Sequence, residues 1–178
     1  MSDALAIALR AALPHDMPAI ADIYAHAVLH GTASFEIEPP DAAEITRRQE
    51  RLLGGGYPCL VAAHGPEVVG FAYAGPYRAR AAYAHTVESS VYVRPDRQRR
   101  GVGLVLLQGL VQEAQLRGFR QMVAVIGDSG NLGSIRLHER VGFTHAGTLR
   151  AVGWKHARWL DTVLMQRALG PGANSRPE

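Results

Sequence analysis

Apolar side chains recur along the chain with two alternating periods, one helical and one extended. A helical period begins after Asp16 and Pro18, which suit a helix start, and it stops at Gly31. The helical period returns over Gly101–Arg117, where Gly118 can end the helix. Between these helices, short runs rich in β-branched and aromatic residues predict strands. The alternation predicts a fold that combines helices with a sheet.

The predicted elements follow one another as strand, two helices, three strands, helix, strand, helix and two strands. The strands are expected at Ala4–Ala12, Pro58–Ala63, Glu67–Ala74, Thr86–Val93, Met122–Ile126, Gly142–Leu149 and Asp161–Arg167. The helices are expected from Asp16 to Gly31, at 42–53 with Asp41 as cap, and at Gly101–Arg117 and Ser134–Val141. Three consecutive strands followed by strand–helix–strand pieces predict a mixed α/β sheet covered by helices on both faces.

The length and composition describe one ordinary globular domain. The 178 residues suit a single domain, which we expect to span residues 1–169. Hydrophobic residues make up 47% and charged residues 20%, which are usual values. No apolar run approaches the ~20 residues that span a bilayer, so we expect no membrane association. Residues 170–178 are rich in glycine, proline and polar residues, and this composition predicts a flexible tail.

Cysteine usage and the N-terminus indicate the compartment. Cys59 is the only cysteine, so no internal disulfide can form, and its apolar surroundings predict a packed strand residue. The first residues lack the positive start and long apolar stretch of a secretory signal. A chain of this kind fits a reducing compartment, and we expect a cytoplasmic location.

The positive charge is concentrated in one place. The net charge is +3, and its densest part is a group of four arginines around a glycine-containing turn: Arg94, Arg97, Arg99 and Arg100. A nucleic-acid footprint would need a longer basic stripe, whereas this group has the size of a phosphate pocket. The pattern favours an anionic cofactor over nucleic acid.

The turn itself, Gln98–Gly103, follows a predicted strand and opens a predicted helix. Glycines let the backbone approach a ligand, and free N–H groups at a helix N-terminus attract phosphate. A single Gly-x-Gly also fits many turns that bind nothing. The segment is neither a Walker motif, which needs Gly-Lys-Ser/Thr, nor a Rossmann fingerprint, which needs a third glycine.

Two signatures together resemble the GNAT superfamily of acetyltransferases. Gln-x-x-Gly-x-Gly after Ser90–Val93 resembles its acetyl-CoA pyrophosphate loop, and Asn131, Ser134 and Leu137–Phe143 resemble its second signature, about 30 residues later. The resemblance implies a GNAT fold, with a mixed, mostly antiparallel twisted sheet of about six or seven strands. It also implies helices on both faces, a splayed strand pair that binds acyl-CoA, acetyl-CoA as co-substrate and no metal.

Finer features resemble the phosphinothricin and methionine sulfoximine acetyltransferases, from about residue 8 to residue 168. These features are Phe71–Pro76, Arg80, Tyr83, Thr86–Val93, Val123–Gly127 and Lys155–Trp159. The loop Gly127–Gly130 and His85 depart from that pattern. The resemblance implies direct acetyl transfer to the amine of an amino-acid analogue such as phosphinothricin, methionine sulfoximine or methionine sulfone. Acetylation of ordinary amino acids, other small amines or a protein N-terminus is an alternative, as is a non-catalytic acyl-CoA sensor.

Two side chains are candidates for the catalytic chemistry. An amine must lose a proton before it attacks a thioester, and Glu88 is a lone carboxylate in an otherwise uncharged strand. Burial would raise its pKa to a useful range, and the resemblance implies a general base here. An outward-facing strand glutamate is the alternative. His138 stands where many GNAT members carry a tyrosine that protonates the departing thiolate; a helix-surface histidine is the alternative.

The resemblance also implies the acetyl-CoA contacts. Pantetheine would pair with the free backbone edge of Val91, Tyr92 and Val93, where the Val91 N–H would bind the thioester oxygen. The pyrophosphate would lie on the loop formed by Arg99, Arg100, Gly101, Val102, Gly103 and Leu104. Asn131 would hold a pantetheine amide, with Ser134 beside it, although Asn131 could equally be a simple helix cap.

An aromatic and arginine-rich loop is the candidate acceptor lid. Arginine reads carboxylates and tetrahedral oxyanions with two parallel hydrogen bonds, which would suit an amino-acid analogue. The candidate acceptor residues are Phe35, Tyr73, Arg78, Arg80, Tyr83, Thr86 and Val87, with Tyr77 nearby. A solvated loop with unrelated aromatic residues is the alternative. The resemblance further implies a homodimer.

Overall fold

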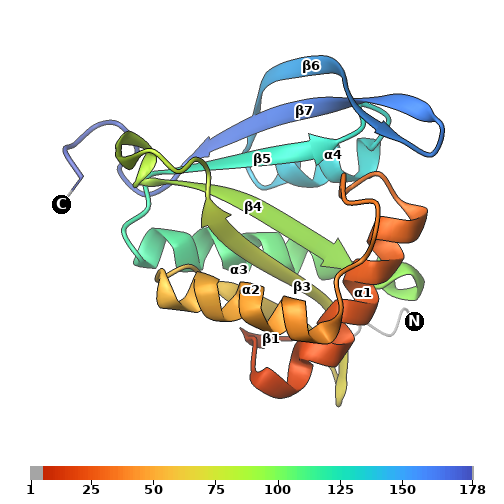
Figure 1. Cartoon of the computed structure of the whole chain (residues 1–178). Coiled ribbons are helices and arrows are strands. Elements are labelled where there is room, and N and C mark those ends of the chain that lie inside the picture. The colour runs from red at the N-terminus through yellow and green to blue at the C-terminus, as the bar shows by residue number, and fades with distance from the viewer. Residues whose placement is uncertain (1–5, 178) are drawn as a thin grey trace, which may run out of the picture.

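The computed structural model describes residues 6–177, and seven strands form a single sheet between helices (Figure 1). The strands are β1 (Ala8–Ala11), β2 (Cys59–His64), β3 (Glu67–Pro76), β4 (Thr86–Val93), β5 (Gln121–Gly127), β6 (Thr144–Lys155) and β7 (Arg158–Ala168). The α-helices are α1 (Met17–His30), α2 (Ala42–Gly54), α3 (Val102–Leu116) and α4 (Leu132–Arg140). Short 3₁₀ turns lie at Pro14–Asp16, Ala81–Tyr83 and Pro95–Arg97.

The sheet consists of two antiparallel parts joined by one parallel pair. Its strand order is β1-β2-β3-β4-β5-β7-β6, and only β4 and β5 run parallel. Parallel neighbours need a crossover, and α3 supplies it between β4 and β5. The α/β fold with a mixed, mostly antiparallel sheet is therefore confirmed.

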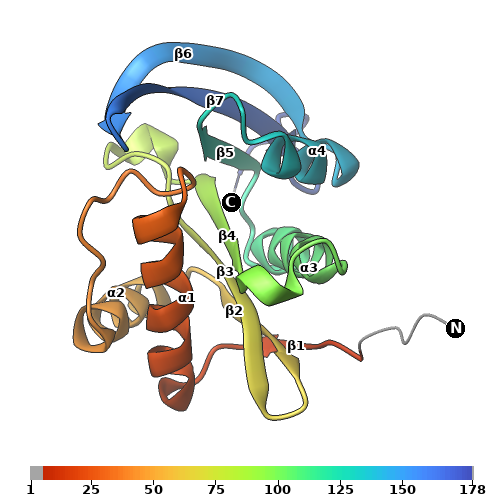
Figure 2. The same cartoon turned by 90° about the vertical axis from the view of Figure 1, so that its right-hand side faces the viewer.

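Helices cover both faces of the sheet, as Figure 2 shows with the sheet seen near its edge. The main core lies between the sheet and α3, where Leu106, Leu110 and Met122 are fully buried. A second core lies under α1 and α2 and includes Ile20 and Phe71. Within residues 6–177, no helix is long and apolar enough to cross a membrane.

The last two strands are longer than the sequence predicted. They form a hairpin whose turn places His156 and Ala157 at φ values of 51° and 55°. Most side chains of β6 are exposed, and Trp154 and Trp159 stand outside the core. A strand that is exposed on both faces does not need alternating apolar and polar residues, so the sequence pattern could not indicate how far β6 extends.

Other boundaries also differ from the prediction. The described part of the first strand begins at Ala8, and the predicted strand residues 4 and 5 lie outside the described residues. Helix α3 begins at Val102 because Gly101 adopts φ 84°, outside the helical region. Helix α4 begins at Leu132 because Asn131 caps it.

The C-terminal residues 170–177 form turns against the end of the sheet. Arg120 donates hydrogen bonds to the Ser175 hydroxyl and the Arg176 carbonyl, at 3.0 and 2.9 Å, and Gly172 is buried. Composition alone predicted a flexible tail because it does not show a docking partner on another element. The contacts of Arg120 argue against a flexible tail. The flexibility of the tail and the domain boundary at residue 169 both stay predictions.

Candidate active site

Strands β4 and β5 separate halfway along their length. Their parallel pairing runs from Thr86 and Gln121 to Ser89 and Ala124 and goes no further, although both strands continue. A small cavity of about 40 Å³ lies where they separate. It is lined by Ala33, Ser89, Ser90, Val91, Tyr92, Ala124, Val125, Ile126, Gly127, Asn131, Ser134 and His138. The structure thus brings Val91, Asn131 and His138 together, as the sequence predicted.

The backbone of β4 presents hydrogen-bonding groups to this gap. The Arg94 N–H donates to the Val69 carbonyl of β3 at 2.9 Å. Amide direction alternates along a strand, so the N–H groups of Val91 and Val93 point away from β3. They therefore face the side on which pairing with β5 has ended. A ligand with amide groups can pair with this edge as an additional strand would.

The glycine turn closes one end of the gap. Gly101 lies at φ 84°, and a side chain on Gly103 would approach Leu137 to 3.2 Å and Val93 to 3.6 Å. Gly103 thus lets α3 pass close to β4 and α4. Arg99 adopts φ 59°, a left-handed conformation that non-glycine residues seldom occupy. The turn leaves the first N–H groups of α3 open to an anion.

The four arginines of the turn divide into two pairs. Arg94 and Arg97 form ion pairs with Glu67 and Asp96. In the part of the chain that the structure describes, no ion pair involves Arg99 or Arg100, and both are exposed. The charge available to a phosphate ligand therefore lies next to the helix N-terminus.

His138 is a buried residue, 4% exposed, so the alternative of a surface histidine is wrong. Its Nδ1 lies 2.8 Å from the Ser134 carbonyl, and its ring packs edge-on against Phe143. Burial lowers the pKa of His138, and the bond to the Ser134 carbonyl opposes that shift. A carbonyl only accepts, so Nδ1 carries the proton and Nε2 carries a lone pair.

Asn131 caps α4, because its side-chain oxygen accepts a hydrogen bond from the Ser134 N–H at 3.2 Å. The alternative interpretation, that Asn131 is a helix cap, is therefore correct for its side-chain oxygen. The side-chain NH₂ group takes no part in this bond, and Asn131 lines the cavity between β4 and β5. The same side chain can thus cap the helix and donate to a ligand.

Glu88 lies in the middle of β4, one residue before parallel pairing ends. It is half-buried and stands between Gly75 of β3 and Val123 of β5. Burial raises the pKa of Glu88, while the positive charge of Arg78 partly opposes the shift. Its side chain shares a sheet face with Ser90 and Tyr92, the face covered by α1 and α2.

The structure does not bring every candidate acceptor residue to this face. Val87 is fully buried in the main core on the α3 side, because neighbouring strand residues face opposite ways. Its side chain cannot touch an acceptor above Glu88, so that assignment is corrected. Thr86 is half-buried on the Glu88 face, at the start of β4.

The lid residues lie in the segment between β3 and β4. Arg78 and Arg80 are exposed, and the Arg78 guanidinium lies 5.1 Å from the centre of the Tyr77 ring. Tyr83 packs edge-on against Tyr77 at 5.6 Å. Tyr73, by contrast, lies within β3, half-buried beside Phe71; burial raises its pKa to about 12, so its hydroxyl stays protonated.

The loop before α2 covers the end of the gap. A side chain on Gly127 would reach within 2.0 Å of the Thr32 carbonyl, and one on Gly153 would collide with the Phe35 ring. Because Gly127 and Gly153 have no side chain, this loop can pack directly against β5 and β6. Phe35 remains 38% exposed, in contact with the hairpin.

Lys155, for which the sequence predicted no individual role, holds this loop in place through a hydrogen bond. Its side chain is 5% exposed, and its ammonium donates to the Ser34 carbonyl at 2.7 Å. The Ser34 hydroxyl in turn bonds the Tyr24 hydroxyl at 2.9 Å. Residues 34 and 155 are far apart in the chain, so no spacing could have revealed the contact.

The histidine pair on α1 has no third partner. His26 and His30 are four residues apart on α1, and their rings lie 4.6 Å from each other. Within residues 6–177, no group of three His, Cys, Asp or Glu side chains is arranged to hold a metal ion.

Similarity to known proteins extends over nearly the whole chain. Residues 20–143 match the acetyltransferase (GNAT) family. A phosphinothricin N-acetyltransferase from Alcaligenes faecalis is 47% identical over 97% of this chain and 88% of its own length. An L-methionine sulfoximine/L-methionine sulfone acetyltransferase from Pseudomonas aeruginosa is 43% identical over 88% of this chain and 91% of its own length.

A solved structure agrees with the fold. The phosphinothricin acetyltransferase from Sinorhizobium meliloti in complex with acetyl-CoA has a TM-score of 0.94 and 43% identity, over 97% of this chain and 93% of that one. This chain belongs to the GNAT family of acetyltransferases. It is an acetyl-CoA-dependent N-acetyltransferase, and the expected family and branch resemblance are both confirmed.

The buried neutral state of His138 predicts a dependence of stability on pH. Its pKa is lower in the folded state, so below about pH 6.5 the unfolded chain binds the extra proton more readily. The free energy of unfolding should therefore fall between pH 7 and pH 5, and it should fall less in His138→Gln. Urea unfolding at both pH values measures this difference. An equal fall in both proteins would mean that His138 is not held neutral.

Proposed function

We propose that the chain acetylates the α-amine of a small amino-acid analogue by direct transfer from acetyl-CoA, with Glu88 as general base. The acceptor is of the phosphinothricin, methionine sulfoximine or methionine sulfone type, as the names of the relatives suggest. The observation that carries the proposal is the position of Glu88. It is the half-buried carboxylate beside the point where β4 and β5 separate.

The residues around the gap fit acetyl-CoA. The Val91 and Val93 N–H groups suit its amide-containing arm, and the open end of α3 with Arg99 and Arg100 suits its pyrophosphate. The Val91 N–H would face the thioester oxygen, where negative charge develops during attack. Acetyl-CoA supplies the activated acetyl group; the protein positions it and removes the proton from the amine.

Glu88 is suited to proton removal by its surroundings. A raised pKa makes its carboxylate a stronger base than an exposed glutamate would be. Arg78 lies close enough to affect it, so the lid and the base belong to one electrostatic environment. Arg78 and Arg80 remain candidates for the acceptor's carboxylate, because both are exposed in the segment between β3 and β4.

His138 enters the reaction as a proton acceptor in this proposal. The acceptor ammonium loses one proton before attack and a second after the new bond forms, and the departing sulfur must gain one. A neutral imidazole with its lone pair on Nε2 can receive a proton, directly or through water, before it passes one to the sulfur. The same lone pair could also order a water molecule.

Homodimeric assembly and a cytoplasmic location belong to the same proposal. The β6–β7 hairpin exposes Trp154 and Trp159, which are 58% and 62% accessible, and Val152 is exposed on the same hairpin. Large exposed apolar side chains of this kind suit a protein interface. The single cysteine, Cys59, is buried, in keeping with a reducing compartment.

Thiol release from acetyl-CoA tests the proposed function. Phosphinothricin, methionine sulfoximine, methionine sulfone and the common amino acids serve as acceptors. Turnover concentrated on the first three is expected. Turnover only with ordinary amino acids, polyamines or a peptide N-terminus would retain the enzyme class and overturn the acceptor assignment. Acetyl-CoA binding with no turnover would favour the sensor alternative.

Replacing the proposed base gives a second prediction. Glu88→Gln should lower kcat by about 10²- to 10⁴-fold and leave acetyl-CoA affinity nearly unchanged. In the wild-type enzyme, kcat/KM should rise with pH through the raised pKa of Glu88, and this limb should be missing in the variant. Glu113→Gln, near the C-terminal end of α3 and ion-paired with Arg117, is the control and should behave as wild type. A wild-type rate for Glu88→Gln across pH would rule out Glu88 as the base.

A further inference from the structure

A short turn joins β5 to α4 and brings Asn131 to the gap between β4 and β5. The turn starts at Asp128, directly after the end of β5 at Gly127. The Asp128 N–H donates to the Asp161 carbonyl of β7 at 2.8 Å, and the Asn131 N–H donates to the Asp128 carbonyl at 3.0 Å. Because both bonds meet at Asp128, the conformation of this residue decides where Asn131 enters the gap.

Asp128 holds a backbone conformation that few side chains adopt. Its φ is 73°, in the left-handed region, where aspartate is less disfavoured than most residues. The Gly130 N–H donates to Oδ1 of Asp128 at 3.0 Å, a local bond that is typical of aspartate in turns. One carboxylate oxygen thus stabilises the turn from within.

The other carboxylate oxygen ties the turn to the β6–β7 hairpin. Arg158, the first residue of β7, donates to Oδ2 of Asp128 at 2.5 Å. The hydrogen bond from Arg158 lowers the pKa of Asp128, as does the bond from Gly130, so the carboxylate stays ionised. Next to it, the Ser129 hydroxyl donates to the Asp161 carboxylate at 2.7 Å. Two adjacent residues of the turn are therefore bound to β7 through side chains.

Helix α4 depends on this turn for its placement. It lies beside β5 in both views (Figure 1, Figure 2) and has nine residues, of which only His138 is buried. Most helical stability comes from tertiary packing, so a short helix with one buried side chain has little hold of its own. Asn131 stands at its start, with its oxygen bound to the Ser134 N–H and its NH₂ group left for a ligand in the gap.

We propose that Asp128 is a positioning residue for acetyl-CoA. Its carboxylate, held between the Gly130 N–H and the Arg158 guanidinium, sets the Asn131 side chain against the pantetheine arm. The inference rests on the part of the proposed function that seats acetyl-CoA between β4 and β5.

Two substitutions separate the two bonds of the carboxylate. Asp128→Gly removes both without backbone strain, because glycine readily adopts a positive φ. Asp128→Asn keeps Oδ1 for the Gly130 N–H and loses the charge that binds Arg158. Asp128→Gly should raise the Kd of acetyl-CoA about fivefold, which is roughly the effect of losing one hydrogen bond from Asn131. Asp128→Asn should raise it about twofold, because the ion pair is partly exposed.

Titration calorimetry measures the Kd of acetyl-CoA, and thiol release measures the KM of methionine sulfone as acceptor. The acceptor KM should stay nearly unchanged in both variants, because Asp128 acts on the donor side of the gap. Arg150→Gln is the matched control. It removes another hairpin arginine, 76% exposed, whose partner Asp161 keeps its bond from Ser129, and its Kd should equal that of the wild type.

The effect of Asp128 should pass through Asn131. Asn131→Ser keeps a helix-capping oxygen and removes the amide donor, so it should raise the Kd of acetyl-CoA about fivefold. Adding Asp128→Gly to Asn131→Ser should cause no further loss of affinity, because the group that Asp128 positions is already gone.

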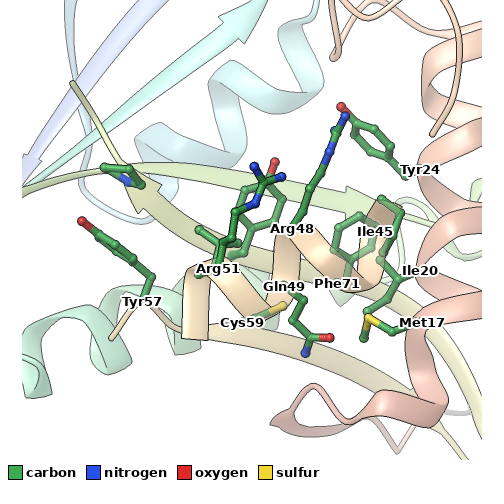
Figure 3. A pocket seen from close by; sticks show the side chains of 13 residues that line it. Met17, Ile20, Tyr24, Ile45, Arg48, Gln49, Arg51, Tyr57, Cys59 and Phe71 are labelled. Carbon is green, nitrogen blue, oxygen red and sulfur yellow. The ribbon is translucent and has the colours of Figure 1, made fainter. Parts of the chain in front are cut away.

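A second control separates positioning from loss of stability. Ile20 is 3% exposed and lines a cavity of about 360 Å³ between α1, α2 and the sheet (Figure 3). It belongs to the second core, whereas Ile135 and Leu137 of α4 pack on the main core. Ile20→Val should lower the midpoint of thermal unfolding by about 2–4 °C and leave the Kd of acetyl-CoA unchanged.

Three results would overturn the inference. An unchanged Kd in Asp128→Gly, with weaker binding by Asn131→Ser, would show that the turn needs no carboxylate and would leave the proposed function intact. Additive losses in the double variant, or an equal rise in acetyl-CoA Kd and acceptor KM, would show a general structural role. An unchanged Kd in Asn131→Ser would overturn the seat of acetyl-CoA as well. Should Asp128→Gly not fold, Asp128→Asn and Arg158→Gln, each expected to raise the Kd about twofold, replace it in the same cycle.

Discussion

Parallel pairing between β4 and β5 ends at Ser89 and Ala124, and the site depends on that interruption. Backbone N–H groups inside a protein need partners, and leaving one unpaired costs about as much as a lost hydrogen bond. Val91 and Val93 direct theirs into the gap, so β4 offers an edge for a ligand in the interior of a sheet. Gly103 lets α3 lie close to β4 and α4, and Asn131 lines the same gap from the start of α4.

The two faces of β4 have different surroundings. Val87 faces α3 and is fully buried in the main core, which fixes the strand in place. Glu88 faces the opposite side, where α1, α2 and the loop containing Ser34 form the walls. Lys155 fastens that loop from the β6–β7 hairpin, and its ammonium is buried against a backbone carbonyl. A rigid strand thus carries a carboxylate with a raised pKa between these walls.

Local patterns predicted the parts of the molecule that local forces determine. The limits of β4 were correct because β-branched residues run from Thr86 to a proline, and Gly101 marked the turn because glycine readily adopts the positive φ needed there. The Lys155–Ser34 contact and the cavity arise from segments distant in the chain, so no spacing could indicate them. Val87 was misplaced because one residue of shift in a strand exchanges the two faces.

Amide hydrogen exchange of β4 with and without acetyl-CoA tests the central claim most directly. The account predicts that acetyl-CoA slows exchange at Val91 and Val93, whose N–H groups face the gap, and leaves Glu88 and Ser90, which are paired with β3, nearly unchanged. Protection elsewhere, with Val91 and Val93 exchanging at the rate of the free protein, would show that the gap between β4 and β5 does not hold the acetyl donor.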